Sequence, residues 1–533
     1  MIALNQKDFY KTDHRRQYPD GTELVYSNFT PRSDRLFNGT KDFDGKIVWF
    51  GMQRFIKDFL IEEYGLFFGL PKEMAVSYYK NRLDRSLGPD AVPMDHIEDL
   101  HDLGYLPLHI KSLPEGSLVP MRVPVLTIVN TKPEFYWLVN DLETVMSTEL
   151  WKPTTVATIA YQYRKLLDRY AEETGAPKEF VPLQGHDFSM RGMSGRADAA
   201  NSGMGHLLSF IGTDTIPAID GIWQYYNGVS SDEIDGCSVP ATEHSVMCMG
   251  TKDDEIGTFK RLINDLYPIG IVSIVSDTWD FWKVVTEYVS ELKDDIMARQ
   301  PITDPEGNVI VPGKTVIRPD SGDPVKVICG YTESEVICEE GKVYEKLELP
   351  LTGLDQITRH KGKELSEPEV KGAVQCLWDV FGGTITEKGY KVLDEHIGLI
   401  YGDSITLDRA ERILEGLKAK GFASCNVVFG IGSYTYQFNT RDTFGFAMKA
   451  TYGEVNGEGR EIFKDPITDS GTKKSAKGLL RVEKEDGEFV LYDQQTKEQE
   501  TMGALQSVFL NGELIVDESF TDIRERLLNG SIN

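Results

Sequence analysis

The chain has 533 residues, of which 40% are hydrophobic, a composition ordinary for globular proteins and a length that favours two domains. Its formal net charge of −27 argues against nucleic-acid binding, because such proteins carry a basic face. No apolar run is long enough to span a membrane, and the start has no signal-peptide core. The 6 cysteines form no C-x-x-C pair, which argues against structural zinc and favours reduced thiols in the cytoplasm.

Short strands and helices are predicted to alternate irregularly over residues 1–150. The pattern indicates strands at 24–29 and 47–50, a β-rich stretch at 108–128, and helices at 53–63, 96–103 and 134–149. A long amphipathic helix is expected at 155–173.

Beyond Gly175 the pattern becomes a regular alternation of strand and helix, typical of a (β/α) barrel. Apolar runs end in small or acidic residues at 210–215, 272–277, 316–323, 399–404 and 427–433. A barrel brings such residues together at the carboxyl ends of its strands, where its active site lies. Arg318 would then be a cation among carboxylates, suited to a phosphate-bearing substrate with a metal. An ordinary surface turn explains the same residues equally well.

The two ends of the chain are β-rich and flank this β/α section. Hairpin turns are expected at Asp486-Gly487 and Asn511-Gly512. The chain is therefore predicted to be an α/β protein, with an irregular (β/α) barrel over 151–434 and a discontinuous α+β domain from 1–150 and 435–533. A charged segment near 330–370 interrupts the barrel, and we interpret it as a solvated insertion.

Two further segments carry candidate chemistry. His186, Phe188 and Arg191 lie within six residues and could line a pocket for a planar anionic ligand. A core phenylalanine beside a surface arginine is the alternative. His244 could transfer a proton or a phosphoryl group near neutral pH, although a lone histidine is more often structural.

Lysines cluster at Lys473, Lys474 and Lys477, which is unusual in so acidic a chain. They could clamp phosphate or simply form a solvated loop. Neither a P-loop nor a Rossmann fingerprint occurs, so a phosphate site would have to be assembled from scattered residues.

Many short motifs of the chain resemble, in order, those of the nicotinate/nicotinamide phosphoribosyltransferase family, and in particular its nicotinamide-specific members. They are D-F-Y-K at 8–11, Q-Y-P at 17–19, N-T-K-P-E-F-Y-W-L at 130–138, H-D-F-S-M-R-G at 186–192, G-T-D-T at 212–215, S-V-P-A-T-E-H-S at 238–245, V-S-D at 275–277, I-R-P-D-S-G at 317–322, G-D-S at 402–404, T-R-D at 440–442 and F-K-D-P at 463–466. No single motif is decisive, but their common order is.

This resemblance implies the irregular barrel of type II phosphoribosyltransferases and a reaction of nicotinamide with phosphoribosyl pyrophosphate. The products would be nicotinamide mononucleotide and pyrophosphate, with Mg²⁺ as cofactor. It also implies a homodimer with active sites at the subunit interface. His244 matches the phosphorylatable histidine through which the family couples ATP hydrolysis to turnover.

The resemblance further implies roles for individual residues. Phe188 and Tyr10, the latter from the partner subunit, would sandwich the pyridine ring, and Asp214 would accept a hydrogen bond from the carboxamide. Asp277 would face the ribosyl group or its metal, and Asp320 would lie near Arg318, which holds the ligand. Ribose and phosphate contacts are expected from Gly402, Asp403, Arg191, Arg441, Lys449, Lys464, Lys473 and Gly432, with Ser433 standing where animal-type members have glycine.

Three other functions are compatible with the sequence. Nicotinate phosphoribosyltransferase is the nearest, and Asp214 argues against it because a carboxylate would repel nicotinate. A barrel hydrolase or lyase using Asp277 and Asp320 as paired carboxylates is a different class. A catalytically silent binding protein is a third.

Overall fold

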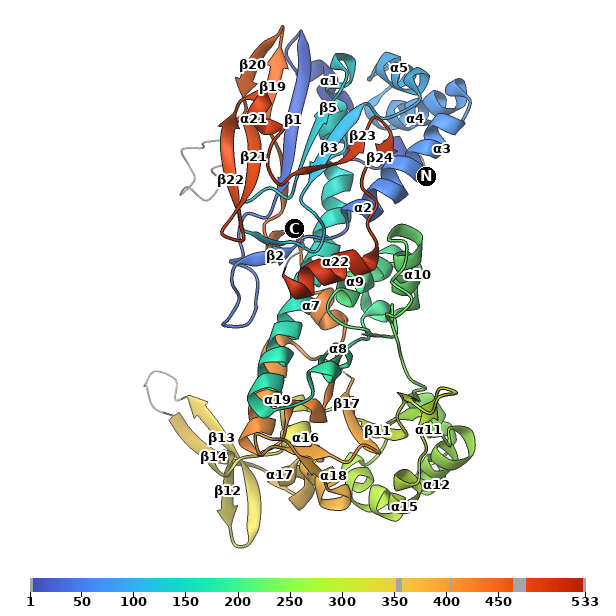
Figure 1. Cartoon of the computed structure of the whole chain (residues 1–533), viewed down its shortest axis with the longest axis vertical. Coiled ribbons are helices and arrows are strands. Elements are labelled where there is room, and N and C mark those ends of the chain that lie inside the picture. The colour runs from blue at the N-terminus through green and yellow to red at the C-terminus, as the bar shows by residue number, and fades with distance from the viewer. Residues whose placement is uncertain (1–2, 351–356, 403, 464–475, 531–533) are drawn as a thin grey trace.

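The computed structural model describes residues 3–350, 357–402, 404–463 and 476–530. It has two lobes, which the long helix α7 (Glu143–Thr174) joins along the length of the molecule (Figure 1). The blue N-terminal and red C-terminal segments share one lobe, here called the sheet lobe, and the middle of the chain forms the other, the barrel lobe. In the part of the chain that the structure describes, no helix has the length and hydrophobicity needed to cross a membrane.

The sheet lobe is built on a seven-stranded antiparallel sheet. Its strands, in spatial order, are β20 (Glu458–Glu461), β19 (Ala447–Val455), β1 (Thr22–Thr30), β5 (Leu126–Asn130), β3 (Leu108–Ser112), β23 (Gln506–Leu510) and β24 (Glu513–Leu514). β1 pairs with β19, so that Asn28 lies opposite Lys449. Because strands from both chain ends hydrogen-bond to each other in one sheet, the discontinuous α+β unit is confirmed. Its limits at residues 150 and 435 stay a prediction.

The barrel lobe is built on a six-stranded parallel sheet. Its order is β7 (Gly212–Thr213), β6 (Gly185–Asp187), β18 (Val428–Ile431), β17 (Ile397–Tyr401), β11 (Lys314–Arg318) and β8 (Ile271–Val275). Strands β8, β11, β17 and β18 contain valine or isoleucine because helices cover them. These include α12 (Glu255–Arg261), α18 (Ala373–Phe381) and α19 (Leu407–Ala419), whose apolar residues join the strands in one core.

An irregular segment links the two edges of this curled sheet. Cys237 bridges to Gly212 at the β7 edge, and Ala241 bridges to Ser273 at the β8 edge. Hydrogen bonds from the Cys237 amide to the Ile211 carbonyl (2.7 Å) and from the Ser273 amide to the Pro240 carbonyl (2.9 Å) extend these bridges. The prediction of an irregular barrel is thus confirmed.

Two predicted elements differ in detail. The single helix expected at 134–149 is instead a 3-10 turn (Pro133–Phe135), the short helix α6 (Leu138–Asp141) and the start of α7, which then continues without a break through Pro153. Pro153 is buried in α7 and packs against Gly51, where a Cβ would lie 2.9 Å from its ring. Tertiary packing therefore offsets the hydrogen bond that proline cannot make. The run at 210–215 is a strand only at Gly212–Thr213.

The predicted insertion forms a separate antiparallel sheet that projects from the barrel lobe (Figure 1). It consists of β12 (Val336–Glu339), β13 (Lys342–Pro350) and β14 (Ile357–Leu365). Its strands carry alternating lysines and glutamates, such as Lys342 paired with Glu364 at 2.8 Å. This charged surface is consistent with the solvated insertion that we predicted.

Glu115 is a buried carboxylate where the sheet lobe meets the helices next to the barrel. It accepts hydrogen bonds from the amides of Gly51 (2.6 Å) and Gln53 at the start of helix α2 (Met52–Phe55). Tyr226, after helix α10 (Ile216–Tyr225), donates to it at 3.1 Å. Burial raises the pKa of Glu115 to about 7, although these hydrogen bonds oppose the shift.

We expect this carboxylate to make the fold less stable as pH rises. The folded pKa lies above the unfolded value of 4.5, so the folded state binds the proton more tightly, and its stability falls between pH 4.5 and 7 by up to about 3 kcal/mol. Denaturant unfolding at pH 5 and 7.5 measures how much the free energy of unfolding falls between these two pH values. This fall should be smaller in Glu115→Gln than in wild type, and it should be unchanged in Glu98→Gln, which alters an exposed glutamate. An equal fall in wild type and Glu115→Gln would contradict the assignment.

Candidate active site

A cavity of about 640 Å³ opens at the carboxyl ends of the parallel strands. Its walls come from segments that follow five of the six strands and from the segment that closes the barrel. The lining residues are Phe188, Met190, Arg191, Asp214, Thr215, Glu243, His244, Arg318, Asp320, Gly402, Ser404, Gly432, Ser433 and Tyr434. The rim predicted from the apolar runs is therefore a real cavity, and Arg318 lies in it rather than in an isolated surface turn.

Arg318 is held in the cavity wall at the end of β11. Its Nη2 donates to the carbonyl of Thr242, and its Nε lies 3.6 Å from Oδ1 of Asp320. The side chain is only 12% exposed. A guanidinium anchored in this way offers fixed donors to a ligand phosphate, because its planar fork matches phosphate oxygens.

His244 and Asp277 form a second polar unit beside it. His244 is the first residue of helix α11 (His244–Met249), and its Nε2 lies 3.0 Å from Oδ1 of Asp277. The other oxygen of Asp277 accepts the amide of Asp320 at 3.0 Å. Burial raises the pKa of Asp277, but hydrogen bonds from Ser321, the Asp320 amide and His244 outweigh it and hold that pKa low. The carboxylate is thus suited to orienting the imidazole.

The two partners differ in exposure. The His244 side chain is 49% exposed and lines the cavity, whereas the Asp277 side chain is 4% exposed and is not among the described lining residues. The structure places Asp277 behind the histidine. In that position its two oxygens contact His244 and the Asp320 amide.

Asp214 follows β7 and has one oxygen occupied by protein donors. Its Oδ1 lies 2.9 Å from Nε2 of His186 and accepts the Ser238 hydroxyl at 2.6 Å. Although burial raises the pKa of Asp214, His186, Ser238 and the charge of Arg318 together lower it below its ordinary value. The group is therefore an anion at neutral pH.

Phe188 lies beside this carboxylate, with its ring centroid 4.6 Å from that of His186. Gly430 of β18 leaves it room, because a Cβ there would lie 2.7 Å from Phe188 Cδ2. Gly402 does the same for Asp320, since a Cβ at this position would lie 2.1 Å from Oδ1. A Cβ at Gly430 would also meet the Tyr401 carbonyl at 2.8 Å, so Gly430 is predicted to be required for steric reasons, whereas a Cβ at Gly402 would displace the Asp320 carboxylate.

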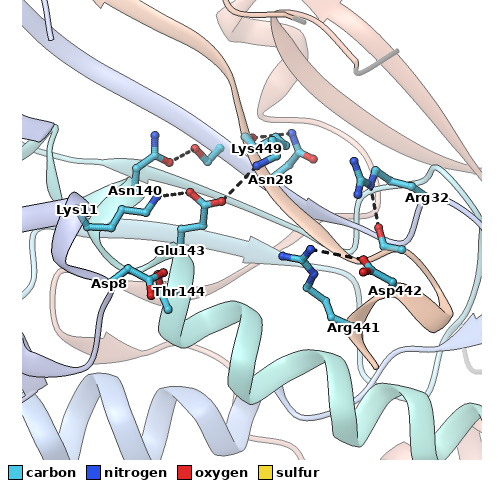
Figure 2. A network of polar contacts seen from close by, with 12 residues as sticks. Asp8, Lys11, Asn28, Arg32, Asn140, Glu143, Thr144, Arg441, Asp442 and Lys449 are labelled. Carbon is cyan, nitrogen blue, oxygen red and sulfur yellow. Dashed lines mark hydrogen bonds and ion pairs between the residues drawn. The ribbon is translucent and has the colours of Figure 1, made fainter. Parts of the chain in front are cut away.

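The remaining predicted residues lie elsewhere. Tyr10, Arg441 and Lys449 are not among the described residues that line the cavity. They lie on the sheet lobe, where Figure 2 shows Arg441 paired with Asp442 and Lys449 paired with Glu143. Asp403, Lys464 and Lys473 lie outside the described residues. In one chain the predicted binding residues are therefore divided into two groups.

Some cavity residues were not singled out from the sequence. Met190, Thr215, Glu243, Ser404 and Tyr434 line the cavity, and Ser238 reaches it only through Asp214. Most of them lie inside the motifs, within one or two residues of a predicted site residue. Their closeness in the sequence to predicted site residues could have identified them. The sequence does not show, however, which of their side chains point into the cavity.

The fold and the cavity at the strand ends define a phosphoribosyltransferase of the type II barrel class. Residues 183–513 match the nicotinate phosphoribosyltransferase (NAPRTase) family, and residues 2–110 match the N-terminal domain of nicotinamide phosphoribosyltransferase. The chain belongs to the nicotinate phosphoribosyltransferase family. The resemblance inferred from the motifs is thereby confirmed.

Relatives in the family include curated enzymes that span nearly the whole chain. The nicotinamide phosphoribosyltransferase of Acinetobacter baylyi is 59% identical over 525 residues, which cover 98% of this chain and 96% of the relative. The nicotinamide phosphoribosyltransferase of Mycoplasma pneumoniae is 34% identical, over 88% of this chain and 93% of the relative. The crystal structure of a Pyrococcus furiosus nicotinate-nucleotide pyrophosphorylase has a similar fold, with a TM-score of 0.54, 13% identity, and coverage of 99% of this chain and 94% of that one.

Proposed function

We propose that this protein is a nicotinamide phosphoribosyltransferase of pyridine nucleotide salvage. It joins nicotinamide to 5-phosphoribosyl-1-pyrophosphate and releases nicotinamide mononucleotide and pyrophosphate. The observation that carries the proposal is Asp214, an anion in the cavity with one oxygen held by His186 and Ser238. Its other oxygen can accept the carboxamide NH₂ of nicotinamide, whereas it would repel the carboxylate of nicotinate. The names of the Acinetobacter baylyi and Mycoplasma pneumoniae relatives point the same way.

The reaction breaks the bond between the ribose C1 and pyrophosphate and forms a bond from C1 to the pyridine nitrogen. Positive charge develops on the ribose, and negative charge develops on the leaving pyrophosphate. Phe188 stacks on the pyridine ring, and Asp214 orients it. Arg318 and Arg191 hold the phosphate groups by charge-assisted hydrogen bonds. Fixed charges around a leaving anion are the main catalytic resource of such a site.

Mg²⁺ fits the donors that the cavity offers. Mg²⁺ is commonly bound by one or two carboxylates together with substrate phosphates and water. Asp320 provides a carboxylate at the rim, and no cluster of three or more potential metal ligands occurs among the described residues. We therefore assign Asp320 as the residue that would hold the ion with the substrate. The ion would neutralise charge on the leaving pyrophosphate.

A homodimer with shared active sites accounts for the residues that lie outside the cavity. Tyr10 is 60% exposed on the sheet lobe, so its ring is free to enter the site of a second copy. Arg441 and Lys449 project from the same lobe and would bring cations to that site. The free thiols of the six cysteines fit a reducing compartment such as the cytoplasm.

We expect His244→Ala to abolish ATP hydrolysis and to leave slow ribosyl transfer. The imidazole is exposed, is oriented by Asp277 and could carry a phosphoryl group from ATP. Asp277→Asn should lower ATP hydrolysis as well, because the amide orients the ring less well; a loss of about tenfold or more is expected. Phosphate release from ATP and pyrophosphate release from the sugar are measured separately. Wild-type ATP hydrolysis in His244→Ala would refute the role.

A pyrophosphate-release assay tests the function itself. Nicotinamide and nicotinate are supplied side by side with phosphoribosyl pyrophosphate and Mg²⁺, with and without ATP. We expect turnover of nicotinamide, little turnover of nicotinate, and stimulation by ATP. Turnover of nicotinate alone would make the enzyme a nicotinate phosphoribosyltransferase. Failure with both bases would favour a barrel hydrolase or lyase.

A further inference from the structure

Glu143 is the first residue of helix α7, and its carboxylate joins two segments from opposite ends of the chain. One oxygen, Oε2, is paired with the ammonium of Lys11, and the other, Oε1, lies 3.3 Å from that of Lys449 (Figure 2). Lys11 precedes β1, and Lys449 is the third residue of β19. A single carboxylate therefore bridges two lysines that the sequence separates by more than four hundred residues.

Lys11 links this carboxylate to Tyr10. The Lys11 residue is 5% exposed, and its Nζ lies 5.1 Å from the centroid of the Tyr10 ring. A second contact fixes the same segment to the start of α7, because Thr144 donates a hydrogen bond to Asp8 at 2.8 Å. Tyr10 is thus an exposed aromatic ring held on a firmly attached segment.

Lys449 is held by the same carboxylate but keeps its tip accessible. Its side chain is 56% exposed, and its carbonyl accepts the side-chain amide of Asn28 on the neighbouring strand at 3.2 Å. The ammonium can therefore contact Glu143 and a second anion together. Without the charge of Glu143, two lysines would face each other across its position and would repel each other more strongly.

We infer that Glu143 is a positioning residue that fixes Tyr10 and Lys449 relative to each other. This inference rests on the proposed function, in which Tyr10 stacks on the pyridine ring and Lys449 contacts a phosphate. Glu143 itself touches no substrate. It sets the spacing between an aromatic contact for one substrate and a cation for the other, so that both enter a site as one unit.

Steady-state kinetics of Glu143→Gln test this directly. We expect the KM for nicotinamide and the KM for phosphoribosyl pyrophosphate both to rise about tenfold, with kcat little changed. This is the pattern expected when a variant weakens the binding of the substrate and of the transition state equally. The matched control is Glu149→Gln, on the same helix. Its carboxylate pairs with Arg54 and has a side-chain exposure of 29%, against 23% for Glu143. We expect Glu149→Gln to keep wild-type KM values.

A double-mutant cycle separates positioning from general destabilisation. In a Lys449→Met background, Glu143→Gln should no longer change the KM for phosphoribosyl pyrophosphate but should still raise that for nicotinamide. If Glu143→Gln does not fold, Glu143→Asp keeps the charge and is too short to span both lysines. It should raise both KM values, more weakly.

Three results would overturn the inference: unchanged KM values in the folded Glu143 variant, equal shifts in Glu149→Gln, or strictly additive losses in the cycle. An inactive wild-type enzyme would instead refute the proposed function, so the two failures are distinguishable.

Discussion

Replacing Arg318 by methionine should lower kcat/KM for phosphoribosyl pyrophosphate by about a thousandfold, because the variant loses a preorganised cation at the leaving group. Arg318 is anchored by the Thr242 carbonyl and lies next to Asp320. Its guanidinium therefore needs no rearrangement when the substrate binds. Methionine fills a similar volume but removes the cation whose Nε lies 3.6 Å from Asp320 Oδ1.

Two comparisons make this expectation specific. Arg318→Lys keeps the charge but loses the planar fork, so it should recover only part of the activity. Arg412→Met removes an exposed arginine of α19, 3.9 Å from Asp408, and should leave kinetics unchanged. Stopped assays of pyrophosphate release and thermal melting are measured for all variants. A loss below about tenfold in folded Arg318→Met would show that the residue is not a major phosphate contact.

The second large effect concerns the choice of base. Asp214→Asn should lower the preference for nicotinamide over nicotinate by roughly ten- to a hundredfold, because like-charge repulsion of the nicotinate carboxylate disappears. The low pKa of Asp214 means that this repulsion is fully present at neutral pH. Competition between the two bases, with both nucleotide products quantified, gives the ratio directly.

Ser238→Ala is the matched control for this experiment. It removes the 2.6 Å hydrogen bond to Asp214 Oδ1 but keeps the charge. Nicotinamide should therefore bind more weakly, while nicotinate stays excluded. A selectivity ratio that is the same in Asp214→Asn and wild type would show that another group discriminates between the bases.

Much of the barrel could be predicted from local pattern. The apolar runs at 272–275, 316–317 and 399–401 lie in parallel strands of the barrel lobe, because strands of a sheet covered by helices are rich in apolar residues. The acids and glycines that follow them lie at one rim because parallel strands end on the same side of a sheet. Asp214, Arg318 and Gly402 line the cavity for this reason.

Other features of the structure depend on contacts between segments that are distant in the sequence. Helix α7 continues through Pro153 because Gly51, more than a hundred residues earlier, packs against the proline ring. Asp277 lies behind His244 rather than in the cavity wall, since its two oxygens are taken by the histidine and by the Asp320 amide. Hydrophobic periodicity reports which face of an element is buried, and it carries no information on which polar groups meet.

By itself, the sequence determined the class of fold, the kind of chemistry at the strand ends and, through its motifs, the family. These follow from residue types and their spacing along the chain, which local patterns preserve. Only the tertiary structure decided that Tyr10 and Lys449 lie on the sheet lobe, apart from the cavity, and that Glu143 joins them. Lys449 lies on β19 opposite Asn28 of β1, and the start of α7 contacts both Lys449 and Lys11. Such contacts between distant segments depend on the packing of the whole chain.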